Sequence, residues 1–268
     1  MSNSLINQAF KIANNENRPA LLTYTVAGDN TKKKSLDILK SISKYADICE
    51  LGFPHNAPIA DGNQIQTSAY RAIKNGIKIN DVFSIVSKFK KIKKKTPIIL
   101  MGYYNMILHY GVKNFVTNCV KNGVDGLIVV DLQPEEDEEL IENLKNSNID
   151  LIRLITPTTN EERLKLILQN ASGFLYFVSV TGITGQKSAN LIELEKSIRK
   201  IKNFTDLPVV PGFGIKNATD VKNICKISDG AVVGSSIIKI IEDNLADKKE
   251  MIRKIDLFTK DLKEATNI

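Results

Sequence analysis

Short apolar runs of strand length alternate along this chain with stretches in which apolar residues recur at helical spacing. A parallel strand buried on both faces reads as a continuous apolar run, whereas an amphipathic helix repeats its apolar residues about every three or four positions. The apolar runs predict eight strands: Ala20–Gly28, Ala46–Phe53, Pro97–Tyr104, Gly126–Asp131, Asp150–Thr156, Gly173–Val180, Pro208–Ile215 and Gly230–Ser235. The helical spacing predicts helices between and after them: Thr31–Lys44, Asn80–Lys94, Val112–Asn122, Glu135–Asn146, Glu161–Gln169, Leu191–Lys202, Asn217–Lys226 and Asp247–Ala265.

Strands that alternate with helices over most of a chain are typical of a (β/α)8 barrel. The competing architecture is an open doubly wound sheet, which more often carries a glycine-rich dinucleotide loop after its first strand. The corresponding segment here, residues 26–29, reads Val-Ala-Gly-Asp and lacks the GxGxxG spacing. We find no internal repeat and no linker. We therefore predict an α/β fold with one TIM (β/α)8 barrel domain over residues 1–268 and an extra N-terminal helix before the first strand.

The composition is ordinary for a globular protein, since 43% of the residues are hydrophobic and 25% are charged. No apolar run is long enough to span a bilayer, and Met1–Ser4 lacks a signal-peptide pattern, so we expect a cytoplasmic protein with no membrane partner. The three cysteines are an odd number without close pairing, which favours a reducing compartment. Two histidines cannot supply a histidine-rich metal site, and we predict no metal.

The formal net charge of +7 raises the question of a nucleic-acid partner. The densest lysine run, residues 90–95, ends a predicted helix in which Ile85, Phe89 and Ile92 form an apolar stripe. We therefore expect these lysines on the solvated face of the helix, near its C-terminus, where cations suit the helix dipole. No aromatic residues alternate with the lysines as a base-stacking surface needs, and we predict no nucleic-acid binding.

A carboxylate, Glu50, lies inside the apolar run Ala46–Phe53. Because side chains alternate along a strand, Glu50 shares one face with Ile48 and Gly52. A buried carboxylate is costly unless it is paired or functional, and desolvation raises its pKa towards the range that a general acid or base needs. Asp61 follows on the next loop, and in a barrel the carboxyl ends of the strands meet at the active site. The alternative is that Glu50 forms a salt bridge and Asp61 begins a turn.

Glycines follow the last three predicted strands, in the segments Thr181–Gly185, Pro211–Gly214 and Val233–Ser236. Glycine lets backbone N–H groups approach an anion, and the dipole of a following helix favours negative charge. Such turns after the seventh and eighth strands of a barrel are typical of a phosphate site. We therefore predict a phosphate site at this point, the alternative being ordinary turns.

Taken together, these motifs resemble the alpha subunit family of tryptophan synthase, in family order and over nearly the whole chain. The matching segments are Glu50–Pro54, Ala60–Gly62, Ile65–Gln66, Tyr103–Asn105, Ser179–Gly185, Gly212–Gly214 and Val233–Ser235. The resemblance implies retro-aldol cleavage of indole-3-glycerol phosphate into indole and glyceraldehyde 3-phosphate, a lyase step of L-tryptophan biosynthesis. It also implies that Glu50 is the acid/base, and that Asp61 accepts a hydrogen bond from the indole N–H and stabilises the developing positive charge.

The resemblance assigns further residues to the site. Tyr176 matches a family active-site tyrosine, and Thr184 matches a residue that orients Asp61 when the loop after the sixth strand closes. The indole pocket is matched by Tyr24, Met101, Tyr103, Ile128, Val130, Leu154 and Phe213. The phosphate cradle is matched by the backbones of Gly185, Gly214, Gly234 and Ser235.

The resemblance further implies a beta-subunit partner in an α2β2 heterotetramer. That partner carries pyridoxal phosphate and receives the indole, so this chain needs no cofactor of its own. The loop after the second strand departs from the family pattern, because Ala57 replaces an aspartate that helps contact the beta subunit and His55 replaces a phenylalanine. These changes predict weaker coupling to the partner. The alternatives are a stand-alone lyase, a catalytically weak regulatory subunit of the beta protein, or another phosphate-sugar barrel such as an epimerase or isomerase.

Overall fold

The computed structural model describes residues 4–178, 187–212 and 214–268. In this part of the chain there are eight strands, and each lies inside one of the predicted runs: β1 (Ala20–Val26), β2 (Ile48–Gly52), β3 (Ile98–Gly102), β4 (Gly126–Val129), β5 (Asp150–Ile155), β6 (Leu175–Phe177), β7 (Val209–Pro211) and β8 (Gly230–Val233). The strands are shorter than the runs because the chain leaves the ladder before the apolar sequence ends.

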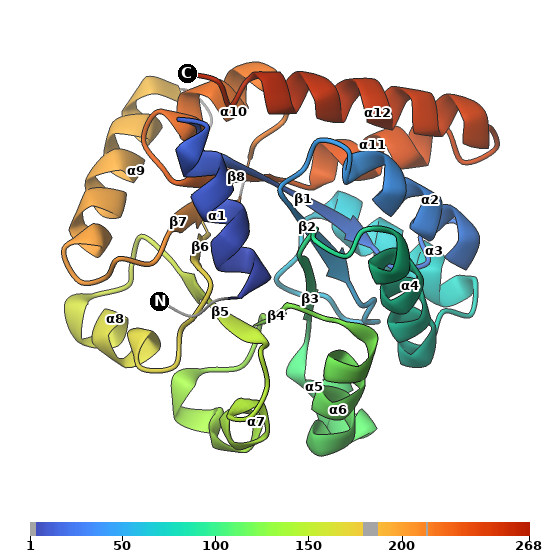
Figure 1. The fold of residues 1–268 in the computed structure, drawn as a ribbon, viewed down its shortest axis with the longest axis horizontal. Helices are drawn as coiled ribbons and strands as arrows, with labels where there is room; N and C mark the ends of the chain where they lie inside the picture. Colours follow the sequence, from blue (N-terminus) through green and yellow to red (C-terminus); the bar gives the residue numbers. More distant parts are fainter. Residues whose placement is uncertain (1–3, 179–186, 213) are drawn as a thin grey trace.

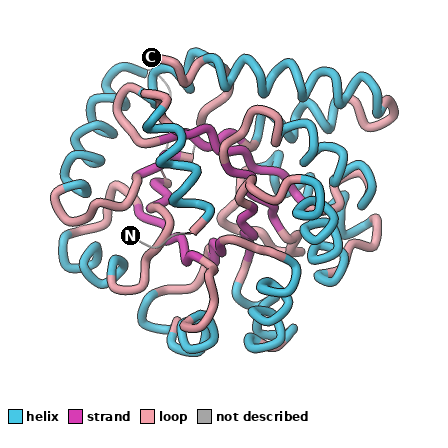
Figure 2. Tube along the Cα trace, viewed as in Figure 1, coloured by secondary structure: helices cyan, strands magenta, loops and turns pink. Residues whose placement is uncertain are grey.

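The strands are parallel and follow the order β7-β6-β5-β4-β3-β2-β1-β8. Asp229, which precedes β8, joins the two ends of this order. Its N–H donates to the carbonyl of Val209 at 3.2 Å, and its own carbonyl accepts from the N–H of Ala20 at 2.9 Å. The strands thereby form a central barrel that the helices surround (Figure 1, Figure 2). The prediction of a TIM (β/α)8 barrel is confirmed.

The helices of the described residues include all the predicted ones, with small differences at their ends. They are α1 (Leu5–Asn15), α2 (Lys32–Ile42), α3 (Asn63–Lys74), α4 (Ile79–Ile92), α5 (Tyr104–Tyr110), α6 (Val112–Asn122), the 3-10 helix η1 (Pro134–Glu136), α7 (Glu138–Leu144), α8 (Glu161–Leu168), α9 (Lys187–Lys202), α10 (Ala218–Cys225), α11 (Ser235–Asp243) and α12 (Lys248–Glu264). The sequence pattern missed α3 and α5. The buried residues of α3 are small (Ser68, Ala69 and Ala72), so they form no large apolar stripe, and α5 is too short to show one.

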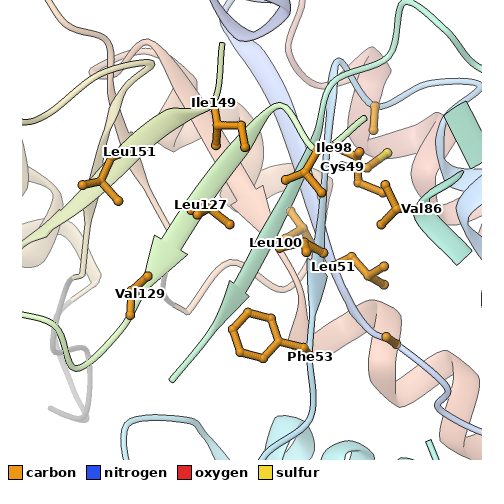
Figure 3. Packing of buried hydrophobic residues seen from close by; sticks show 14 of the residues in the cluster. Cys49, Leu51, Phe53, Val86, Ile98, Leu100, Leu127, Val129, Ile149 and Leu151 are labelled. Carbon is orange, nitrogen blue, oxygen red and sulfur yellow. The ribbon is translucent and has the colours of Figure 1, made fainter. Parts of the chain in front are cut away.

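Side chains alternate between a core inside the barrel and a core between the strands and the helices. On β2, Ile48 belongs to the inner core, whereas Cys49 and Leu51 belong to the outer core. Figure 3 shows the outer core, where Leu100 of β3 lies between Leu51 of β2 and Leu127 of β4. Glu50 therefore points into the barrel, as the alternation along β2 predicts.

Carboxylates at the amino ends of the strands accept hydrogen bonds from the backbone of the preceding strand. Asp125, before β4, accepts from the N–H of Ile98 at 2.8 Å and from Lys90 Nζ at 2.9 Å. The expectation that the whole lysine run is solvated is therefore wrong for Lys90, whose side chain is 14% exposed. Ile92, expected in the apolar stripe, is 54% exposed, because α4 ends there and the stripe has no surface left to cover.

The extra N-terminal helix α1 covers the amino-terminal end of the barrel (Figure 1). Ile6 of α1 is fully buried in the inner core, and the ring of Phe10 lies 5.7 Å from that of Phe174. This end is thus filled by side chains, and the opposite end is left to hold a ligand. In the part of the chain that the structure describes, no helix is both long and apolar enough to cross a bilayer.

Candidate active site

A cavity of about 380 Å³ opens at the carboxyl ends of the strands, where barrels of this architecture have their active sites. Much of its wall is made by apolar and aromatic side chains, namely Tyr24, Ile65, Met101, Val130, Leu154, Tyr176, Val178, Ile215 and Val232. Polar groups and glycines complete the lining, namely Asp61, Gly62, Gln64, Thr156, Gly212, Gly214, Gly234 and Ser235, together with Ala60. The cavity therefore suits a small molecule with a large apolar part and a polar end.

Glu50 lies inside the barrel on β2, in register with Tyr24 of β1 and Ile99 of β3. Its side chain is fully buried, and neither carboxylate oxygen has a hydrogen-bond partner among the described residues. Desolvation raises the pKa of Glu50 to about 8. The salt-bridge alternative is wrong, because no cation faces this carboxylate in the part of the chain that is described. Glu50 is therefore a neutral acid near pH 7 that can give up and recover a proton.

Asp61 lies on the loop between β2 and α3 and is half-buried at the cavity wall. The hydroxyl of Tyr103 donates to Asp61 Oδ2 at 3.0 Å, and the N–H of Ala60 donates to that hydroxyl at 3.0 Å. Burial raises the pKa of Asp61, and the hydrogen bond from Tyr103 acts in the opposite direction because it stabilises the charged form. The hydroxyl of Tyr103 thus orients the carboxylate while it favours ionisation.

Two buried tyrosines, Tyr24 and Tyr176, line the cavity together with Asp61. Burial raises the pKa of both phenols well above the usual value, and the charges that Glu50 and Asp61 carry when ionised raise each of them further. Both therefore remain neutral. The hydroxyl of Tyr176 donates to the carbonyl of Gly212 at 3.3 Å. A Cβ atom at residue 212 would lie only 2.0 Å from the hydroxyl oxygen of Tyr176. Glycine is thus required at residue 212 for Tyr176 to hold this position.

Backbone of the β7 and β8 loops forms the other end of the cavity. Gly214 has φ +76°, which favours glycine, and Gly234 is the N-cap of α11. The first N–H groups of a helix have no intrahelical acceptor and carry partial positive charge. The start of α11 at Ser235 thus lines the same cavity as Asp61 and has the features of an anion site.

Ten of the predicted site residues line the cavity or a smaller crevice beside it: Tyr24, Asp61, Met101, Tyr103, Val130, Leu154, Tyr176, Gly214, Gly234 and Ser235. Glu50 is not part of this lining and lies on β2 in register with Tyr24 of β1. Thr184, Gly185 and Phe213 lie outside the described residues. Ile128 is fully buried in the inner core and does not line the cavity, whereas Val130 and Leu154 do. Sequence reasoning missed five lining residues: Gln64, Thr156, Val178, Ile215 and Val232. The last four can be found from their places at or just beyond strand ends.

A barrel that presents a desolvated acid beside an oriented second carboxylate, under an apolar cavity, is an enzyme of the general acid–base type. The comparisons with known proteins narrow this class. The family model for the tryptophan synthase alpha chain matches residues 10–267.

Two curated relatives bear the name tryptophan synthase alpha chain. The protein from Pelagibacter ubique (strain HTCC1062) is 52% identical over 256 residues, which cover 94% of this chain and 95% of that protein. The one from Petrotoga mobilis is 41% identical over 261 residues, covering 97% of this chain and 99% of that protein. A solved tryptophan synthase subunit alpha from Legionella pneumophila superposes with a TM-score of 0.92 at 31% identity and covers 99% of both chains. The chain belongs to the tryptophan synthase alpha chain family, and with it to the carbon–carbon lyases.

Proposed function

We propose that this chain cleaves indole-3-glycerol phosphate into indole and glyceraldehyde 3-phosphate, with Glu50 as the group that moves the proton. The observation that carries the proposal is the fully buried, unpartnered Glu50 carboxyl, whose pKa of about 8 keeps it protonated at neutral pH. A retro-aldol cleavage needs an acid that protonates a weakly basic carbon and a base that then accepts a hydroxyl proton. One carboxyl group with a pKa near the working pH serves both steps.

Glu50 donates one proton and later accepts another, so the reaction returns it to its initial protonated form. As a neutral acid it donates its proton to indole C3, which converts the aromatic ring into an indolenine cation. As a carboxylate it then accepts the proton of the hydroxyl on the adjoining glycerol carbon. The bond between that carbon and C3 breaks, its electron pair returns to the ring, and the carbon becomes the aldehyde. Glu50 ends protonated, and since no electrons are transferred to or from the substrate, the reaction calls for no redox cofactor.

Asp61 is proposed to accept a hydrogen bond from the indole N–H and to stabilise the positive charge of the cation. The hydrogen bond from Tyr103 supports this role, since it holds the carboxylate at the cavity wall and favours its ionised form. An apolar cavity strengthens the attraction between the carboxylate and the cation, because few dipoles screen it. Thr184 is proposed to orient Asp61 further from the loop after β6.

The phosphate is proposed to bind at the start of α11, against the backbones of Gly214, Gly234 and Ser235, with Gly185 completing the cradle. The support is the exposed helix N-terminus at one end of the cavity and the apolar wall at the other. This arrangement matches the substrate, whose indole ring is apolar and whose phosphate is anionic.

The proposed partner is a tryptophan synthase beta subunit that holds pyridoxal phosphate and takes up the indole, in an α2β2 heterotetramer. On the β2 loop, Ile59 is 87% exposed, and Leu108 on the neighbouring α5 is 48% exposed. Large exposed apolar side chains such as these support a contact surface on this part of the molecule. A soluble, cytoplasmic location is proposed with this partner.

The test is indole release from indole-3-glycerol phosphate by the purified chain, with and without a beta subunit, beside Glu50→Gln. We expect slow release that the partner increases and that the Gln variant lowers at least about 100-fold, as loss of a general acid–base group does. Fast release that the partner leaves unchanged would favour a stand-alone lyase. Absence of release under both conditions would overturn the proposal and leave a regulatory subunit or another phosphate sugar.

A further inference from the structure

Two helices that begin at the cavity, α3 and α11, have no capping side chain that fixes where they start. Helix α3 begins directly after the loop that carries Asp61, and its Ile65 lines the cavity. Helix α11 begins at Ser235, where the phosphate is proposed to bind. The N-cap of each helix is a glycine, Gly62 or Gly234, without a side-chain hydrogen bond to the first turn. The separation of the two helix starts must therefore be set by contacts elsewhere along the helices.

Such a contact lies near the other ends of these helices, at Arg71 in the last turn of α3. Its Nε and Nη2 donate to the two carboxylate oxygens of Asp29 at 2.9 and 3.0 Å, and its Nη1 donates to Glu242 of α11 at 3.0 Å. Asp29 also accepts a hydrogen bond of 2.6 Å from the hydroxyl of Ser68, one turn earlier in α3. A guanidinium fork on a carboxylate fixes direction as well as distance. One side chain thus joins α3, α11 and the loop after β1, which carries Asp29.

These charged side chains lie where each would be unfavourable without the others. The side chains of Asp29 and Arg71 are only 1% and 16% exposed, and a buried charge is costly unless it is paired. Glu242 lies in the last turn of α11, where the helix dipole disfavours a negative charge, and its ion pair with Arg71 offsets this effect. None of the three residues lines the cavity, so the chemistry proposed above does not account for them.

The loop after β1 makes a second connection between the same helices, through Asn30. Its Nδ2 donates to the carbonyl of Leu245, which lies just after α11, at 2.8 Å. Its own carbonyl accepts a hydrogen bond of 2.7 Å from the side chain of Asn75, the C-cap of α3. Asn30 has φ +70°, in the left-handed region that asparagine adopts more readily than most residues. Residues 29 and 30 therefore hold the carboxyl ends of α3 and α11 on one short loop.

We propose that Arg71, through Asp29 and Glu242, is a positioning residue that sets the separation between Asp61 and the phosphate site. Hydrogen-bonded helices behave as rigid elements, so a connection that fixes their carboxyl ends also fixes where their amino ends lie. A substrate that reaches from one helix start to the other then meets two sites already separated by its own length, which lowers the entropic cost of binding both ends. This inference rests on the proposed function, which supplies the two-ended substrate.

The test compares a ligand that has both ends of the substrate, indole-3-propyl phosphate, with its two fragments, indole and propyl phosphate. The Kd of each compound is measured by NMR titration of the wild type, Arg71→Lys and Glu242→Ala. Lysine keeps the positive charge but cannot form the fork on Asp29. Alanine removes only the contact with α11, at a side chain that is 34% exposed, so this variant should fold. Because only folded protein binds, a loss of stability alone would not change the Kd of the linked ligand relative to those of the fragments.

We expect the Kd of indole-3-propyl phosphate to rise about tenfold in both variants, while the Kd of each fragment changes less than about twofold. The control is Arg18→Lys, since Arg18 makes the same fork on Asp47 and a second ion pair with Glu16 at the amino end of the barrel. Its three Kd values should equal those of the wild type. An unchanged Kd of the linked ligand in the Arg71 and Glu242 variants, or an equal rise for propyl phosphate alone, overturns the inference. If the wild type binds the linked ligand no more tightly than the fragments, the proposed function fails and the inference fails with it.

Discussion

Replacement of Glu50 by glutamine should make the folded protein more stable at alkaline pH even though it removes the proposed acid. The wild-type carboxyl is fully buried, without a partner among the described residues, and its pKa is raised from 4.5 to about 8 by desolvation. Glutamine has nearly the same shape and never carries a charge. The substitution therefore removes the cost of burying an ionised group and leaves the packing of the inner core in place.

The sign follows from the two pKa values. Below pH 4.5 the carboxyl is protonated in both states, and its ionisation does not affect the free energy of unfolding. Between pH 4.5 and about 8 the unfolded chain has released the proton and the folded protein still holds it, so wild-type stability falls as the pH rises. Within this interval each pH unit lowers the free energy of unfolding of the wild type by about 1.4 kcal/mol, so the whole interval lowers it by about 5 kcal/mol. The advantage of Glu50→Gln should therefore grow by about this amount from pH 4.5 to 8.5 and then level off.

The assay is equilibrium unfolding in urea at pH 5, 6.5, 8 and 9, followed by far-ultraviolet circular dichroism and by tyrosine fluorescence, since the chain has no tryptophan. The quantity of interest is the difference in unfolding free energy between variant and wild type at each pH, because groups common to both cancel. Glu136→Gln, at an exposed residue, is the control, and its difference in unfolding free energy from the wild type should not change with pH. A flat difference for Glu50→Gln as well would refute the desolvation of Glu50, and with it the reason for expecting a neutral acid at pH 7.

Three further predictions concern the phosphate end, the barrel floor and the partner. Ser235→Asp places a negative charge at the start of α11, so KM for indole-3-glycerol phosphate should rise at least about tenfold while thermal stability holds or increases slightly; an unchanged KM would contradict the phosphate assignment. Asp125→Ala leaves the N–H of Ile98 and the ammonium of Lys90 without their acceptor, and urea unfolding should show a loss of about 2 to 3 kcal/mol with kcat unaffected. Ala57→Asp should increase activation of indole release by the beta subunit; equal activation in both proteins would count against weak coupling.

The eight strands were predictable because each is buried on both faces and so reads as an apolar run. The residues at which the strands end could not be predicted in this way. The predicted third strand extended to Tyr104, yet the strand ends at Gly102 and Tyr103 is the N-cap of α5. Where a strand stops depends on the last ladder hydrogen bond with its neighbours, which the apolar pattern does not contain. Helix α3 was missed for a different reason, since its buried face consists of residues too small to produce an apolar pattern.

The order of residues along the chain is enough to place a carboxylate on the inward face of a buried strand, a second carboxylate on the loop after it, and glycine turns at other strand ends. It could not determine whether Glu50 meets a cation, because desolvation depends on everything that surrounds a group once the barrel has closed. It also could not place Tyr103 against Asp61 or His55 against Tyr103, since these contacts join the start of α5 to the loop after β2. The types of functional group are local properties of the chain. Their pKa values and orientations arise from side chains that the fold brings together from distant segments.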